Sequence, residues 1–114
     1  MATRSTIGYE TAGGGYVGVY CHYDGYPDHM GPILHRMFHA DVVIMVNKAL
    51  AVGGIRSIGT EGAAEIELFS DPDPTTAYTQ WPCCPEQYAY RKRIDGRVEW
   101  TDDHGSFREW KPAD

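Results

Sequence analysis

The sequence predicts a single α+β domain, in which an antiparallel sheet of about five strands carries two helices packed on one face. The chain has 114 residues, 42% of them hydrophobic, which suffices for one small core and not for two. Runs rich in β-forming residues lie near both ends, and two runs with helical spacing of apolar residues lie between residues 28 and 50. We therefore treat residues 1–114 as one domain.

A β-hairpin is expected first. Ser5–Glu10 and Tyr16–Tyr23 are β-rich, and the three glycines at 13–15 suit the tip between them. Because side chains alternate along a strand, one face of the second run should be core; it carries Val17, Val19, Cys21 and Tyr23. The opposite face carries Tyr16, Gly18, Tyr20 and His22. Three interpretations of this face remain open: it is exposed to solvent, it is covered by another subunit, or it forms part of a pocket.

Two helices should follow the turn at Asp24–Pro27. The first is expected over Asp28–Phe38, capped by Asp28. Its buried side should consist of Ile33, Leu34, Met37 and Phe38. The second should begin at a cap, Asp41, and end at Gly53-Gly54. Its buried stripe should consist of Val42, Met45, Val46, Ala49 and Leu50.

The second half of the chain is predicted to be rich in β-structure. A strand is expected over Ala64–Phe69, and a loop over Asp71–Pro85, which contains four prolines. The clearest hairpin joins Gln87–Ile94 to Arg97–Thr101, because Asp95-Gly96 between them suits a type I′ turn. Ser106–Trp110 is expected to add a last strand.

Composition excludes several classes of protein. A formal charge of -6 argues against direct nucleic acid binding, which depends on lysine and arginine. The longest apolar stretch, interrupted by Asn47 and Lys48, is too short for a membrane span, and residues 1–5 lack the apolar core of a secretion signal. Cys21 and the adjacent pair Cys83-Cys84 make no disulfide framework. We expect a cytoplasmic protein without membrane contact, which as a short chain would gain stability as a homo-oligomer.

A polar cluster spans the end of the second strand and the first helix; it contains Cys21, His22, Asp24, Asp28, His29, His35 and His39. His35 and His39 stand one helical turn apart, a geometry that metals use, but no complete ligand set accompanies them. We expect no metal and no cofactor. His22 and Asp24 point the same way on a strand and suit general acid-base chemistry, but Cys21 points oppositely, so no triad forms. A small hydrolase using His22 and Asp24 is thus an alternative to a binding protein.

The basic residues suggest an anion site. Arg91 and Arg93 share a strand face, where two guanidinium groups can grip a phosphate or carboxylate. The competing interpretation is an edge strand protected by charge. In the hypothesis that we favour, Arg91 and Arg93 bind ligand, whereas Arg4, His22 and Asp24 hold structure through an Arg4–Asp24 ion pair. Alternatively the latter three form, with Tyr26, a small pocket for an anionic, nucleotide-like ligand.

Two patterns resemble a family of small bacteriophage proteins. They are Thr3-Arg4-Ser5-x-Ile7-Gly8 and Tyr20-Cys21-His22-x-Asp24-Gly25-Tyr26-Pro27, the second followed by Gly31-x-x-Leu34. The resemblance covers about the first third of the chain. It implies a phage accessory protein in the host bacterial cytoplasm, serving host takeover or counter-defence, and it implies no mechanism.

Together these observations favour binding over catalysis. We expect the protein to sequester an anionic, nucleotide-like ligand. A second hypothesis is inhibition of a host or defence protein through an acidic surface, and the small hydrolase is a third.

Overall fold

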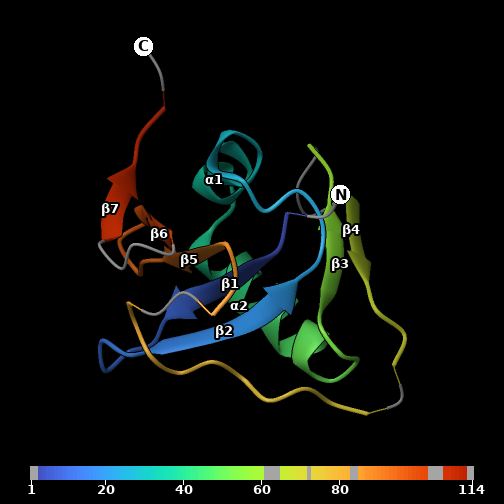
Figure 1. Ribbon diagram of the computed structural model, residues 1–114. Helices are drawn as coiled ribbons and strands as arrows, with labels where there is room; N and C mark the ends of the chain where they lie inside the picture. The colour runs from blue at the N-terminus through green and yellow to red at the C-terminus, as the bar shows by residue number, and fades with distance from the viewer. Residues whose placement is uncertain (1–2, 61–64, 72, 83–84, 103–106, 113–114) are drawn as a thin grey trace.

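The computed structural model describes residues 3–60, 65–71, 73–82, 85–102 and 107–112 (Figure 1). The described residues form two helices and a seven-stranded mixed sheet, with strand order β4-β3-β2-β1-β5-β6-β7. In chain order the elements are β1 Ser5–Glu10, β2 Tyr16–Cys21, α1 Pro27–Arg36, α2 His39–Leu50, β3 Ile55–Ile58, β4 Ile66–Leu68, β5 Tyr88–Lys92, β6 Val98–Asp102 and β7 Phe107–Trp110. No helix in these ranges is both long and apolar enough to cross a bilayer.

The α+β class is confirmed, but the expected five-stranded antiparallel sheet is corrected to seven strands of mixed direction. β1 pairs antiparallel with β2 and parallel with β5, and β2 pairs parallel with β3. Two parallel strands need a long crossover, which the two helices supply between β2 and β3. The strand Ile55–Ile58 was not expected, because it is short and directly follows the glycines that end α2.

Both helices pack on the same face of the sheet. α2 lies over β1 and β2, and α1 lies over β5, β6 and β7. One hydrophobic cluster joins them to the sheet; its sheet residues include Ile7, Val19, Tyr90 and Val98. The stripe predicted for α2 is confirmed, with Val42, Met45, Val46 and Ala49 buried and Leu50 partly buried against the cluster.

The helix starts differ from expectation. α1 begins at Pro27, with Tyr26 as its N-cap, and α2 begins at His39, with Phe38 as its N-cap; Asp28 and Asp41 lie in the first turns. A proline suits the first helical position because its missing N–H would have no partner there. Phe38 is 77% exposed, so its predicted burial is wrong. As the N-cap of α2 it belongs to the connection between the helices rather than to the buried side of α1.

Two turns depend on glycine. Gly53 and Gly54 both have positive φ angles, 97° and 124°, which turn the chain away from the helix axis shortly after α2 ends at Leu50. At the β5–β6 turn only Gly96 has a positive φ, 95°, and its N–H bonds to the Arg93 carbonyl. The turn is therefore a type I turn with a bulge at Gly96, and the predicted type I′ turn is wrong.

Residues 73–82 run along the edge of β2, and Trp81 reaches over the face of the sheet opposite the helices. Tyr78 forms two backbone hydrogen bonds with Gly18, and the Trp81 ring lies 5.1 Å from the ring of Tyr16. Gly8 and Gly18 make room for Tyr16, because a Cβ at either position would lie within 2.6 Å of its ring. Tyr16 is consequently only 3% exposed, so the protein's own loop covers this part of the face that carries the tyrosines.

Candidate functional site

The turn after β2 is held tightly against the sheet. Asp24 adopts a left-handed φ of 57°, which Asp tolerates better than most residues. Gly25 approaches so closely that a Cβ would lie 2.4 Å from the Ser5 hydroxyl. The Gly25 N–H donates to the Thr3 carbonyl at 2.9 Å, and the Tyr90 hydroxyl donates to the Gly25 carbonyl at 2.5 Å. These contacts of Asp24 and Gly25 therefore fix the turn that leads from the end of β2 directly into α1.

Four aromatic rings gather at this end of the sheet, and we call them the strand-end cluster: Tyr20, His22, Tyr23 and Phe69. The Tyr20 hydroxyl and His22 Nδ1 share a 2.6 Å hydrogen bond. The His22 ring lies 4.4 Å from Tyr23 and 6.1 Å from Phe69, while Tyr20 stacks on Phe69 at 6.4 Å. Tyr23 is 38% exposed and the other three rings are partly exposed, so the cluster offers aromatic surface to solvent.

Two arginines flank the strand-end cluster. Burial raises the pKa of Tyr20, and the positive charge of nearby Arg4 opposes that effect. Arg4 is exposed, and no carboxylate in the described ranges forms an ion pair with it. Arg56 lies 5.9 Å from the centre of the Tyr23 ring and pairs with Glu67 at 3.3 Å. Both partners of that pair are more than half exposed, so the attraction is weak.

Of the four residues predicted to gather at the end of the strand, Arg4 and His22 lie together, whereas Asp24 and Tyr26 lie apart from them. Arg4 and His22 come together around Tyr20, as the hairpin register implied. The expected Arg4–Asp24 ion pair is absent from the described part of the chain, where backbone bonds and the Tyr90 hydroxyl hold the turn instead. Tyr26 is 40% exposed and packs on His29, at the start of α1.

His22 and Asp24 are not joined to each other by a hydrogen bond within the described structure. The Nδ1 atom of His22 bonds instead to the Tyr20 hydroxyl. The Cys21 thiol lies on the buried side, donating to the Tyr23 carbonyl at 3.6 Å, and burial raises its pKa to about 12. A buried thiol with so high a pKa is a poor nucleophile.

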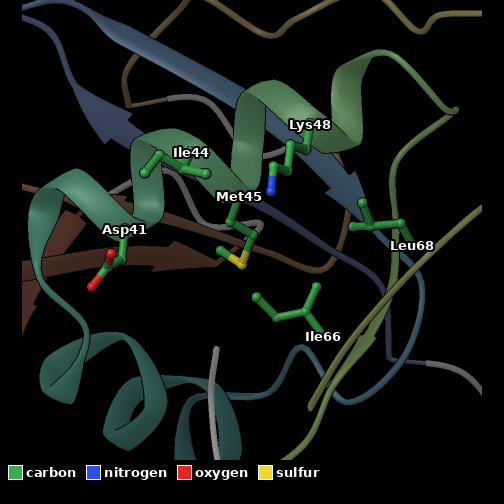
Figure 2. A pocket seen from close by; sticks show the side chains of 6 residues that line it. All are labelled: Asp41, Ile44, Met45, Lys48, Ile66 and Leu68. Atoms are coloured by element: carbon green, nitrogen blue, oxygen red, sulfur yellow. The ribbon is translucent and has the colours of Figure 1, made fainter. Parts of the chain in front are cut away.

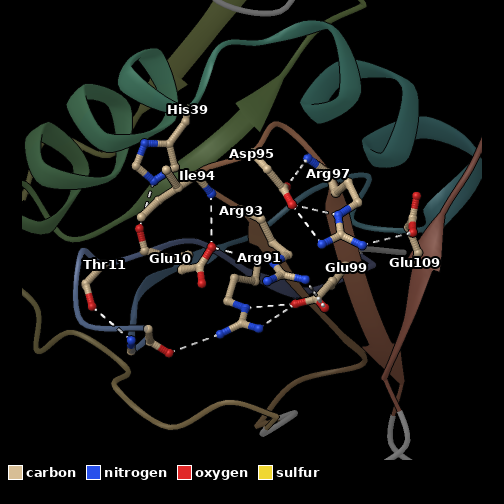
Figure 3. Close-up of polar contacts among 12 residues, drawn as sticks. Glu10, Thr11, His39, Arg91, Arg93, Ile94, Asp95, Arg97, Glu99 and Glu109 are labelled. Carbon is tan, nitrogen blue, oxygen red and sulfur yellow. Dashed lines mark hydrogen bonds and ion pairs between the residues drawn. The ribbon is translucent and has the colours of Figure 1, made fainter.

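Arg91 and Arg93 lie on the sheet face opposite the helices, among acidic partners (Figure 3). Arg91 Nε and Nη2 donate to Glu99 Oε1 at 2.8 and 2.6 Å, and the guanidinium lies 5.4 Å from the Trp81 ring. Arg93 lies 3.5 Å from Glu10 and 3.7 Å from Glu99. A backbone bond from Ile94, with the charges of these arginines, lowers the pKa of Glu10. Both guanidinium groups are thus already neutralised.

The remaining histidines make structural contacts. His29 Nε2 lies 2.7 Å from the Ile58 carbonyl, His39 Nε2 lies 2.8 Å from the Glu10 carbonyl, and His35 packs on Trp110. Among the residues that the structure describes, no three His, Cys, Asp or Glu side chains are arranged to hold a metal ion. Cys83 and Cys84 lie outside the described residues.

Sequence reasoning missed two parts of the site. Phe69 and Arg56 lie far in sequence from the residues that follow β2, and only the pairing of β2 with β3 and of β3 with β4 brings them beside those residues. Glu99 lies directly opposite Arg91 in the observed β5–β6 register, whereas the predicted two-residue turn at Asp95-Gly96 would have placed Trp100 opposite Arg91. Comparison with models of protein families, with curated proteins and with solved structures finds no match.

Proposed function

We propose that this protein binds a small, nucleotide-like anion at the strand-end cluster and sequesters it. One observation carries the proposal: a group of partly exposed aromatic rings lies beside an arginine that has no carboxylate partner in the described ranges. Aromatic side chains stack on nucleobases whatever the base, with about 1–3 kcal/mol gained per stacked base. A guanidinium group binds phosphate through charge-assisted hydrogen bonds.

Arg4 suits the role of phosphate ligand better than the sheet-face arginines. A phosphate approaching Arg91 has to displace Glu99, which accepts two hydrogen bonds from its guanidinium group. A phosphate approaching Arg93 has to compete with the charges of Glu10 and Glu99, although Arg93 Nε has no hydrogen-bond partner among the described residues. At Arg4 no carboxylate among the described residues has to be displaced, because its side chain interacts with the Tyr20 hydroxyl. That Arg91 and Arg93 bind ligand stays a prediction, and the experiment below distinguishes the two locations.

Sequestration also suits the proposed context of a phage accessory protein in host takeover or counter-defence. A protein that only holds a ligand needs no nucleophile and no paired general acid and base. This agrees with a buried Cys21 and with a His22 that bonds to Tyr20 rather than to a carboxylate.

The proposal is tested by titrating nucleoside mono-, di- and triphosphates into the protein by calorimetry, then recovering the ligand after heat denaturation. We expect binding, and recovery of the ligand unchanged. Arg4→Ala and His22→Ala should each weaken binding about tenfold, which is about 1.4 kcal/mol. Arg108→Ala is the matched control, because Arg108 is also exposed and lies 4.2 Å from an aromatic ring, that of Trp100.

Each other outcome points elsewhere. Loss of binding in Arg91→Ala with normal binding in Arg4→Ala would place the ligand on the sheet face. Recovery of a chemically altered ligand would indicate the hydrolase. Absence of binding across the panel would contradict sequestration and direct attention to the acidic surface and a protein partner.

A further inference from the structure

The outward side of α2 carries an apolar residue that the fold does not use. Ile44 is 52% exposed, whereas Val42, Val46 and Ala49 on the inner side are fully buried. Beside it an open hollow of about 330 Å³ separates α2 from β4, the short strand at one edge of the sheet (Figure 2). The hollow is lined by Asp41, Ile44, Met45, Lys48, Ile66 and Leu68.

The charges on this side of α2 are arranged symmetrically. Asp41 and Lys48 are seven residues apart, two helical turns, so they lie on one side of the helix, about 10 Å apart along its axis. Ile44 and Met45 lie midway between them. Both charged side chains are exposed, and neither has an ion-pair partner among the residues that the structure describes.

We propose that a second copy of this chain docks here, with the two α2 helices antiparallel across a two-fold axis near Ile44. In that arrangement Asp41 of each copy faces Lys48 of the other, and Ile44 of each copy covers the apolar wall of the other's hollow. A two-fold interface uses the same patch on both copies, so the patch must complement itself. A negative and a positive charge at equal distances on either side of an apolar centre meet that requirement.

Other surfaces fit a second copy less well. The tyrosine side of β2 is partly occupied by the protein's own residues 73–82, which leave Tyr16 buried. The face with Arg91 and Arg93 satisfies its charges internally. The α2 patch combines exposed apolar surface with charges that lack partners in the described ranges.

The test is sedimentation equilibrium of the full chain from low to high micromolar concentration. We expect a dimer. D41K and K48D should each raise the dissociation constant about tenfold, because each turns two attractive contacts into two repulsive ones. An equimolar mixture of D41K and K48D should dimerise again, since every cross-interface contact then joins opposite charges.

Ile44→Glu should give a monomer, and Ile94→Glu is the control because Ile94 is equally exposed, at 53%, on the β5–β6 turn. A wild-type protein that is monomeric throughout would overturn the proposal, as would single charge variants that dimerise normally. A mixture that stays monomeric would also overturn it. If circular dichroism shows that Ile44→Glu does not fold, the equimolar mixture of D41K and K48D decides whether the proposed interface exists.

Discussion

Replacing Glu99 by alanine should destabilise the protein strongly, because the carboxylate neutralises a guanidinium group that is largely removed from water. The side chains of Arg91 and Glu99 are 12% and 9% exposed, and two hydrogen bonds join them. In Glu99→Ala the Arg91 guanidinium group stays between Trp81 and the sheet, but it has lost the Glu99 carboxylate that neutralised it. Arg93 loses one of its two acidic neighbours and keeps Glu10.

The size of the effect follows from burial. Removing one partner of a buried ion pair costs about 3–5 kcal/mol, because an uncompensated charge remains. The remaining exposure of Arg91 and its contact with Trp81 place the expected loss near the lower end, about 3 kcal/mol. For a domain of this size about 1 kcal/mol shifts the melting temperature by about 4 °C, so Glu99→Ala should melt about 12 °C lower. Arg91→Ala should be similarly destabilised.

Urea unfolding followed by circular dichroism measures this loss. The double variant Arg91→Met/Glu99→Leu should be more stable than either alanine variant, since it leaves no unpaired charge. Arg97→Ala is the control, because Arg97 pairs with Asp95 where both side chains are about half exposed, and its unfolding midpoint should hardly move. A loss below about 1 kcal/mol in Glu99→Ala, or additive losses in the double variant, would refute the reasoning.

Two further predictions concern buried titratable groups. Lys92 Nζ donates to the carbonyls of His35 and Gly96, and burial lowers the pKa of this amine. Between that lowered pKa and the ordinary lysine pKa of about 10.4, the unfolded chain therefore binds more protons than the folded protein. The free energy of unfolding should therefore rise with pH in this interval by more in wild type than in Lys92→Met; parallel urea curves at several alkaline pH values would contradict this. Cys21, with a pKa of about 12, should resist iodoacetamide in the folded protein and react once unfolded. Peptide mass spectrometry measures this, and rapid labelling without denaturant would show an accessible thiol.

Local signals predicted the elements that are local in sequence. The β1–β2 and β5–β6 hairpins and the buried stripe of α2 depend on alternation, turn residues and helical spacing, all of which lie within about twenty residues of one another. The parallel pairing of β1 with β5 joins Ile7 to Tyr90, and no local pattern encodes a contact between segments so far apart. The prediction of an antiparallel sheet failed for that reason, whereas the strand count failed because the short strand β3 was not expected.

The site was predicted in the same uneven way. The predicted hairpin correctly brought Arg4 and His22 together, because the two residues flank its paired strands. Strand alternation assigned Tyr23 to the core, but β2 ends at Cys21, so the ring turns toward solvent and joins the strand-end cluster. The exposed Phe38 shows the same limit, since helical spacing alone cannot locate where one helix ends and the next begins.

The position of β1 in the middle of the sheet has a consequence during synthesis. Its antiparallel neighbour β2 follows within a few residues, but its parallel neighbour β5 begins only at Tyr88. Until the ribosome has released that segment, β1 presents a row of unpaired N–H and C=O groups to other nascent chains, the kind of edge that promotes aggregation. Completion of the C-terminal strands is therefore also the step that protects the N-terminal strand from intermolecular pairing.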